Sequence, residues 1–280
     1  MSNILDIIGN TPMIKIKNNV FAKMEKFNPS GSVKDRPVSY MIRNAINTEK
    51  ITKNKIILDA TSGNTGISIA MISTVLGYRS LLVMPESMSV ERRKIMRSYG
   101  SEIVLVQGDM DNAISKAKQL AMNGKYYYLD QFSNEYNVQA HYETTGKEIW
   151  EQTGGKVTHL VIGIGSGGTI TGVARLLKEK NPEIRIIGIE PRGGIQGLKD
   201  LSKNKKPEIL DFSNVDEIVN VNVEQADRAV RKLAKMGLFV GQSSGAAYYV
   251  AEKITSGVVV VIFPDGGEKY LSTEMFNSSD

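Results

Sequence analysis

Short runs of apolar residues alternate along this chain with longer stretches whose apolar positions recur at helical spacing. The apolar runs predict strands at residues 20–24, 55–59, 80–84, 102–106, 126–129, 159–164, 185–189 and 258–263. The helical pattern predicts helices at residues 37–47, 64–76, 89–100, 111–123, 144–152, 168–180, 225–236 and 245–254. Several of the strands are apolar nearly throughout, which is typical of parallel strands buried on both faces. The alternation therefore predicts an α/β fold with mainly parallel sheets.

A glycine-containing loop interrupts this alternation near the middle of the chain. Thr153, Gly154 and Gly155 form the predicted loop, and a new strand–helix–strand unit follows it. The domain boundary is therefore predicted near residues 140–155. We expect an N-terminal domain of residues 1–140 and a C-terminal domain of residues 141–280.

Composition narrows the possible functions. With 280 residues, 41% of them hydrophobic, the chain is long enough for two domains that share a cleft. The net charge of +5 is spread along the chain, and the densest basic run, residues 203–206, is too short for a nucleic-acid surface. The absence of cysteine excludes disulfides, cysteine nucleophiles and thiolate metal sites. The two histidines are too few for a histidine-rich metal site. No signal peptide or membrane span is recognisable, so we expect a cytoplasmic protein without a metal.

Residues 28–37 (NPSGSVKDRP) carry the first candidate for chemistry, Lys34. Turn-forming residues lead directly into a helix start, and Lys34 lies at the junction. The positive end of the helix dipole disfavours the charged form of the amine, and imine formation requires the neutral form. A lone lysine before a helix is usually a surface residue, so this assignment depends on the motifs that accompany it.

Two further loops combine glycines with hydroxyl groups at helix starts. Residues 61–66 (TSGNTG) follow a strand and could bind a substrate carboxylate through exposed N–H groups and hydroxyls, or could simply cap the helix. Residues 163–169 (GIGSGGT) could wrap a phosphate in the same way. Gly163, Gly165 and Gly168 also spell G-x-G-x-x-G with Glu190 further on, which is the pattern of a dinucleotide-binding dehydrogenase.

Two segments near the C-terminus are less specific. Residues 241–247 (GQSSGAA) place two hydroxyls at a helix start, where capping alone could account for one of them. Residues 263–270 (FPDGGEKY) form a turn after the last strand, which is either a functional segment or only a tight turn.

Taken together, these motifs resemble the cysteine synthase family, also called O-acetylserine sulfhydrylases, which are fold-type II pyridoxal-phosphate (PLP) enzymes. The resemblance runs from residues 8–12 to residues 270–273. Residues 88–93, 129–132 and 141–146 are similar to the cysteine synthase B branch in particular. The resemblance implies two three-layer α/β/α domains with mainly parallel, twisted sheets and the cofactor in the cleft between them. It also implies that strands within residues 12–34 cross into the sheet of the second domain.

The resemblance assigns roles to individual residues. Lys34 would hold PLP as a Schiff base and would move the proton of the substrate α carbon. Asn64 would bond the 3′-oxygen of the cofactor, and Ser243 would face its pyridine nitrogen. The phosphate would lie in a cup made by Gly165, Ser166, Gly167, Gly168 and Thr169. The substrate carboxylate would be held by Thr61, Ser62, Thr65 and Gln131.

The implied reaction replaces the acetate of O-acetyl-L-serine by sulfide through an α-aminoacrylate intermediate and yields L-cysteine. Cystathionine β-synthase, O-phosphoserine sulfhydrylase and cysteine β-lyase are alternatives on the same scaffold. Alternatives of another class are an NAD-dependent dehydrogenase and a non-catalytic partner of serine acetyltransferase. By the same resemblance we expect a homodimer, with serine acetyltransferase as a candidate partner.

One stretch departs from the family pattern. Residues 192–199 are compressed relative to the B branch, which carries arginines near residue 199. Lys199 or Arg192 could therefore bind a charged leaving group of the substrate, or could be an ordinary charged surface residue.

Overall fold

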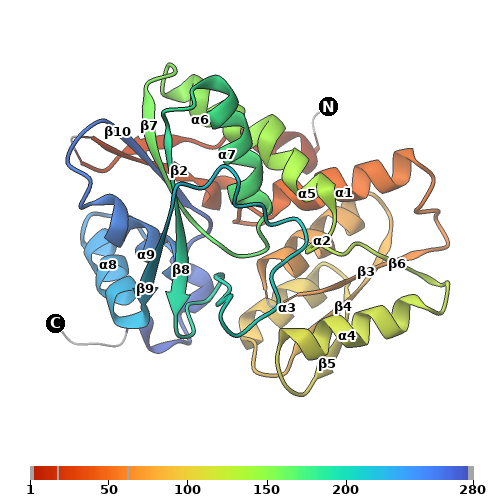
Figure 1. Cartoon of the computed structure of the whole chain (residues 1–280). Coiled ribbons are helices and arrows are strands. Elements are labelled where there is room, and N and C mark those ends of the chain that lie inside the picture. The colour runs from red at the N-terminus through yellow and green to blue at the C-terminus, as the bar shows by residue number, and fades with distance from the viewer. Residues whose placement is uncertain (1–2, 18, 62, 277–280) are drawn as a thin grey trace.

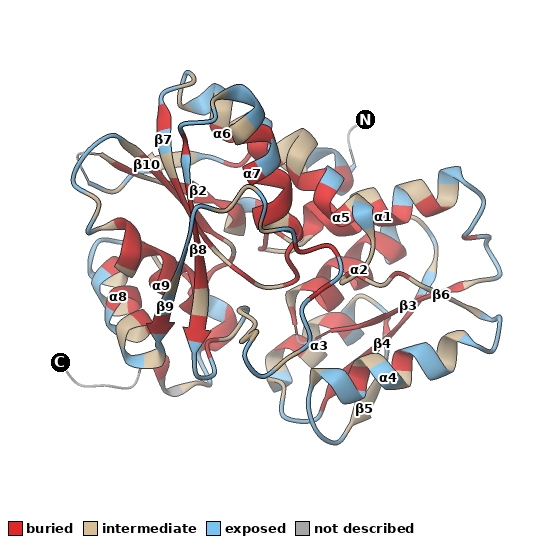
Figure 2. Ribbon diagram, in the orientation of Figure 1, coloured by how far each residue is buried: buried red, intermediate tan, exposed pale blue. Residues whose placement is uncertain are grey.

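The computed structural model describes residues 3–17, 19–61 and 63–276, and it arranges them in two lobes, each built around one sheet (Figure 1). The inner strands of both sheets are largely buried, and the outer helices are buried on the faces that they turn toward the strands (Figure 2). No helix in the described ranges is long and apolar enough to cross a bilayer.

The smaller sheet has four parallel strands in the order β5-β4-β3-β6. Its strands are β3 (Ile56–Ala60), β4 (Arg79–Pro85), β5 (Glu102–Val106) and β6 (Tyr126–Tyr128). The helices α1 (Asp35–Asn47), α2 (Asn64–Val75) and α3 (Val90–Ser98) share one hydrophobic core with one face of this sheet. Helix α4 (Met110–Ala121) packs on the other face. Neighbouring strand residues such as Ile57 and Leu58 therefore enter different cores, so the buried strands read as continuous apolar runs.

The larger sheet has six strands in the order β1-β2-β10-β7-β8-β9. They are β1 (Met13–Lys15), β2 (Val20–Met24), β7 (Val157–Gly163), β8 (Arg185–Arg192), β9 (Glu217–Asn222) and β10 (Val258–Phe263). Only the β1–β2 pair is antiparallel, and β2 pairs in parallel with β10. Helices α6 (Lys147–Gln152) and α7 (Gly168–Lys180) cover one face, while α8 (Val223–Lys235) and α9 (Gln242–Ala251) cover the other.

The remaining elements are short. Helix α5 (Glu135–Ala140) continues into a π-helical segment (His141–Gly146) that leads to α6. The four 3-10 turns are Ile4–Ile7, Glu25–Phe27, Gly267–Tyr270 and Glu274–Phe276.

The predicted α/β class with mainly parallel sheets is confirmed, and every predicted strand and helix has a counterpart. The sequence pattern does not predict β1, β9 or α5, and it predicts an α-helix from residue 144 where part of the π-helical segment lies. The early strands β1 and β2 lie in the larger sheet with strands from the end of the chain. The proposed division into domains at residue 140 stays a prediction.

Candidate active site

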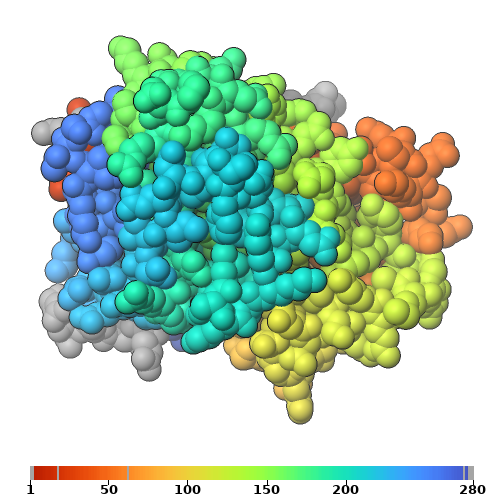
Figure 3. Space-filling model, viewed as in Figure 1, coloured from red at the N-terminus to blue at the C-terminus, as the bar shows by residue number. Residues whose placement is uncertain are grey.

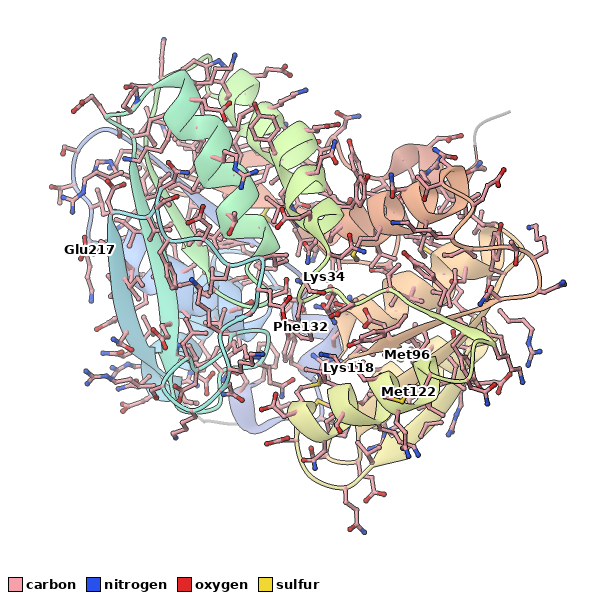
Figure 4. The ribbon with its side chains drawn as sticks, turned by 45° about the vertical axis from the view of Figure 1, so that its right-hand side comes forward. Lys34, Met96, Lys118, Met122, Phe132 and Glu217 are labelled. Atoms are coloured by element: carbon pink, nitrogen blue, oxygen red, sulfur yellow. The ribbon has the colours of Figure 1, made fainter. Side chains whose placement is uncertain are left out.

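Two connected cavities lie between the lobes, beyond the carboxyl ends of the parallel strands, where open α/β sheets bind ligands. The inner cavity is lined by the 165–169 loop together with Lys34, Asn64, Ser243 and Asp265. The outer cavity is lined by Thr65, Gln131 and residues 193–200, among others, and it shares Lys34 with the inner one. Figure 4 shows Lys34 and Phe132 in the region between the lobes, and in Figure 3 the segment after β8 lies across the front of this region.

Lys34 immediately precedes α1, and its side chain is half-buried where the two cavities meet. Its Nζ donates to Oγ of Ser166 at 3.3 Å, so the amine lies beside the predicted phosphate loop. Burial lowers the pKa of Lys34 to about 8, and the charge of Asp265 opposes this shift. The sequence argument attributed the weakened charge to the helix dipole, whereas burial is its main cause in the structure. A substantial fraction of the amine is therefore neutral near physiological pH.

The loop of residues 165–169 connects β7 to α7 and requires its glycines. Gly167 has a φ of +94°, and a Cβ added there would lie 2.7 Å from Cβ of Leu210. A Cβ on Gly165 would lie 2.8 Å from the carbonyl oxygen of Gly197. The first N–H groups of α7 have no acceptor within the helix, so they can donate to an anion bound in this loop.

A histidine that the sequence analysis did not assign to the site supports this loop. Nε2 of His141 lies 3.2 Å from Oγ1 of Thr169, and its Nδ1 lies 2.9 Å from Oγ1 of Thr145. Burial lowers the pKa of His141 well below its usual range, so the ring is neutral at pH 7. Its position in the π-helical segment is consistent with the frequent occurrence of such segments at functional sites.

Asn64, the first residue of α2, is held from both sides by the turn that follows β10. Its Nδ2 donates to Oδ2 of Asp265 at 2.7 Å, and its Oδ1 accepts from Nζ of Lys269 at 3.0 Å. Lys269 also donates to the carbonyl oxygens of Ser30 and Gly31 at 3.1 Å each. Because an ammonium group cannot accept a hydrogen bond, the Asn64 oxygen must face Lys269 and the Asn64 nitrogen must face Asp265. The 263–270 segment is thus more than a tight turn, although the sequence alone left both readings open.

Ser243 and Asp265 give the inner cavity two further polar walls. Ser243 lies in the first turn of α9 and is 4% exposed. Asp265 is 1% exposed, and its Oδ2 also accepts from the hydroxyl of Tyr270 at 2.7 Å. Its Oδ1 is buried without a hydrogen-bond partner among the described residues and packs against Gly241.

The predicted carboxylate-binding residues divide into two groups. Oγ1 of Thr65 donates to Oε1 of Gln131 at 2.7 Å, and both residues line the outer cavity. Oγ1 of Thr61 instead accepts from the backbone of Gly63 and Gly66 at 3.1 and 3.0 Å, so this hydroxyl supports the loop from within. Ser62 lies outside the described residues. The predicted ligand roles of these residues stay predictions.

The structure bears on two alternatives that the sequence left open. Oε1 of Glu190, the candidate ribose-binding acid of a dehydrogenase, accepts from the backbone N–H of Leu201 at 2.8 Å, so it has a local structural partner. Of the two residues considered for a charged leaving group, Lys199 lines the outer cavity, whereas Arg192 is not among its described lining residues.

The residues of the inner cavity fit pyridoxal phosphate. Lys34, whose amine is partly neutral near physiological pH, can form a bond to the aldehyde of the cofactor. The glycine loop at the start of α7 can bind its phosphate, and the Ser243 hydroxyl and the Asn64 amide can form hydrogen bonds to its ring. Cβ atoms at Gly165 or Gly167 would overlap neighbouring residues, which shows that this loop requires glycine.

Comparison with known proteins agrees with this fit. The family model described as pyridoxal-phosphate dependent enzyme matches residues 4–265. The chain is 44% identical to cysteine synthase of Aquifex aeolicus, covering 99% of this chain and 93% of the relative. It is 42% identical to cysteine synthase B of Escherichia coli, over 99% and 96%. It is 37% identical to O-acetylserine dependent cystathionine beta-synthase of Bacillus subtilis, over 99% and 98%.

Solved structures give the same result for the fold. O-ureido-L-serine synthase superposes with a TM-score of 0.93 at 36% identity, covering all of this chain and 96% of that one. Cysteine synthase from Entamoeba histolytica also gives a TM-score of 0.93 at 36% identity, covering all of this chain and 92% of that one. These matches leave no support for the dehydrogenase alternative. The chain belongs to the cysteine synthase family of pyridoxal-phosphate-dependent enzymes.

Proposed function

We propose that this chain forms L-cysteine from O-acetyl-L-serine and sulfide, a β-replacement that uses PLP. The observation that carries the proposal is the amine of Lys34, which lies where the inner cavity, lined by the glycine loop, Asn64 and Ser243, meets the outer cavity. The names of the most similar relatives support the same reaction.

The inner cavity would hold the cofactor in a defined orientation. Lys34 would bond its aldehyde, Asn64 its phenolic oxygen, and Ser243 its pyridine nitrogen. The phosphate would take the loop of Gly165, Ser166, Gly167, Gly168 and Thr169, next to the N-terminus of α7. When bound, PLP supplies an electron sink that stabilises negative charge at the substrate α carbon.

The side chains of this protein would perform the proton transfer and the positioning. Thr65 and Gln131, already joined by a hydrogen bond, would hold the substrate carboxylate, with Thr61 and Ser62 in the same loop. The substrate amino group would displace Lys34 from the cofactor, and the freed amine of Lys34 would then take the proton from the α carbon, because an amine with a pKa of about 8 is a competent base near neutral pH. Acetate then leaves from the β carbon, sulfide adds there, and Lys34 returns the proton.

Ser243 influences which reaction follows. A hydroxyl beside the pyridine nitrogen does not enforce protonation of that nitrogen, as a carboxylate partner does in other PLP enzymes. Negative charge then stays closer to the α carbon, which favours rapid loss of a β leaving group. This arrangement supports β-replacement over reactions that need a long-lived carbanion.

A second candidate is cystathionine formation, because one relative at 37% identity is an O-acetylserine dependent cystathionine beta-synthase. The two reactions differ in the thiol that adds to the β carbon. Steady-state rates of the PLP-loaded protein with O-acetylserine, O-phosphoserine and serine, each with sulfide and with homocysteine, separate them. We expect O-acetylserine with sulfide to be the fastest pair, and equal or faster turnover of homocysteine with O-acetylserine or with serine would contradict the proposal.

We further propose, from the family resemblance, that the enzyme is a cytoplasmic homodimer and that serine acetyltransferase is a candidate partner. Light scattering of the purified protein tests the first statement and should give twice the mass of 30.8 kDa. A pull-down with serine acetyltransferase tests the second.

A further inference from the structure

Arg92, in the first turn of α3, is a buried cation at the boundary between the outer cavity and the substrate loop. The residue is 4% exposed and lines the outer cavity with Thr65 and Gln131. A Cβ added to Gly63 would lie 2.7 Å from Nε of Arg92, so the guanidinium chain rests directly on the backbone of this loop.

Among the described residues, Arg92 has no direct carboxylate partner; its polar contacts are with Gln196 and with Tyr270, whose hydroxyl also donates to Asp265. Its Nη1 donates to Oε1 of Gln196 at 2.9 Å, a neutral acceptor from the segment after β8. Its guanidinium carbon lies 5.0 Å from the centre of the Tyr270 ring, and its Nε is buried without a partner among the described residues. Within those residues no carboxylate forms an ion pair with it.

A buried guanidinium without a counter-charge is costly, and an anion that enters the adjacent cavity removes this cost. The other cations of the outer cavity are placed differently. Lys199 lies over the Phe132 ring at 5.0 Å, and the exposed Lys203 is 3.8 Å from Asp200. Lys34 would be bonded to the cofactor. Among the described cations that line the outer cavity, Arg92 is therefore the one that rests on the backbone of the substrate loop.

We propose that Arg92 is the counter-charge for the carboxylate of the amino-acid substrate and makes the outer cavity selective for α-amino acids with an ionised carboxylate. Thr65 and Gln131 provide neutral hydrogen bonds, and Arg92 adds the charge from behind Gly63. Its bond to Gln196 links the substrate loop to the segment after β8, so the same residue connects the two sides of the outer cavity. This inference rests on the proposed amino-acid substrate and specifies how that substrate is recognised.

Binding of L-serine and of L-serinamide to the PLP-loaded protein tests the proposal, because serinamide has a neutral amide of similar size in place of the charged carboxylate. Dissociation constants come from the change in visible absorbance of the cofactor, without turnover. Arg92→Gln should weaken L-serine binding about tenfold or more, as expected for a lost hydrogen-bonded charge, and should change L-serinamide binding less than about threefold. Arg92→Lys keeps the charge and should retain most of the preference for serine.

Two matched variants serve as controls. Lys94→Gln removes an exposed charge from the same helix and should change serine binding less than about threefold. Lys199→Gln removes a half-buried cation of the outer cavity that does not contact the described residues of the substrate loop, and serine should still be preferred.

Unchanged serine binding in Arg92→Gln would overturn the proposal, as would equal losses for serine and serinamide, which indicate a role in shape alone. If Lys199→Gln loses the preference for serine and Arg92→Gln keeps it, the counter-charge is Lys199, and the proposal is wrong. If Arg92→Gln does not retain PLP, the test uses Arg92→Lys, which keeps the charge. Loss of the preference for serine in Arg92→Lys with PLP bound would then contradict the proposal. Because the assay measures binding, a failure of cysteine synthesis would leave its result readable.

Discussion

The amine of Lys34 changes charge near pH 8 because burial disfavours its cationic form, while the carboxylate of Asp265 opposes this effect. The neutral amine is the form that reacts with an aldehyde. The rate at which cofactor-free protein binds PLP should therefore rise with pH up to about 8 and then level off. Stopped-flow absorbance measures this rate. Asp265→Asn removes the opposing charge, so the inflection should move to lower pH, and a shift to higher pH would contradict this account.

Lys269 gives a second prediction at the residue scale. Its ammonium fixes the amide of Asn64 and ties it to the backbone of residues 30–31. Lys269→Met should lower PLP affinity about tenfold, because one charged hydrogen bond that orients the amide is lost. Fluorescence titration measures the affinity, and Lys269→Arg should restore most of it. Lys26→Met serves as the control, because Lys26 contacts the same turn from outside through Phe239 and Glu268.

The motifs that carry Lys34, Asn64 and the glycine loop could be found in the sequence because each occupies a few consecutive residues. The roles of Lys269 and Arg92 could not, since their contacts join distant positions. Lys269 bonds Asn64 across 205 residues, and Arg92 bonds Gln196 across 104. No local pattern records such a pairing, so only the fold reveals which polar side chains meet.

At the scale of elements, the sequence predicted those with a strong apolar pattern and missed those without one. Strand β9 is mostly exposed and carries one buried residue, Val221. Helix α5 has six residues, too few to show a helical period. The π-helical segment after it differs from an α-helix only in its hydrogen-bond spacing, which residue types do not specify.

The close packing of α7 against α5 and the π-helical segment leads to a prediction. A Cβ at Gly172 would overlap the carbonyl oxygen of Val138 and lie 2.8 Å from the backbone nitrogen of Tyr142. Gly172→Ala should therefore lower the free energy of unfolding by about 1–3 kcal/mol, as overpacked sites do. Urea denaturation measures the loss. Gly194→Ala is the control, because a Cβ there meets no atom within 4 Å, and an equal loss in both variants would contradict the explanation.

At the scale of the whole molecule, a buried ionic network joins α6 to the segment that runs from β2 into α1. Arg36 donates to Glu25 at 2.7 Å and to Glu148 at 2.6 Å, and Lys23 donates to Glu148 at 2.5 Å. Burial by itself would raise the pKa of Glu148, but its bonds to Arg36 and Lys23 lower it from 4.5 to about 2. The ionised carboxylate thus stabilises the folded chain.

The pH dependence of stability follows from this lowered pKa. The contribution of Glu148 is fully present above pH 4.5 and is lost as the pH falls toward 2. Glu148→Gln should lower the free energy of unfolding by about 3 kcal/mol at pH 7, because two buried cations lose a partner. Denaturation at pH 7 and at pH 3 should show the difference from the parent protein shrinking at the lower pH. Glu208→Gln, at an exposed position, should show no such change.

The pairing of β2 with β10 also affects how the chain folds during its synthesis in a cell. During synthesis, β2 is complete at residue 24, whereas its parallel neighbour begins at residue 258. The nascent chain on the ribosome must therefore carry β2 with the edge that faces β10 unpaired until nearly all of the sequence has emerged, which exposes it to aggregation. Asp265 and Lys269 follow β10 directly, so cofactor capture belongs to the final stage of folding. A chaperone that shields β2 should raise the yield of folded enzyme more than added cofactor does.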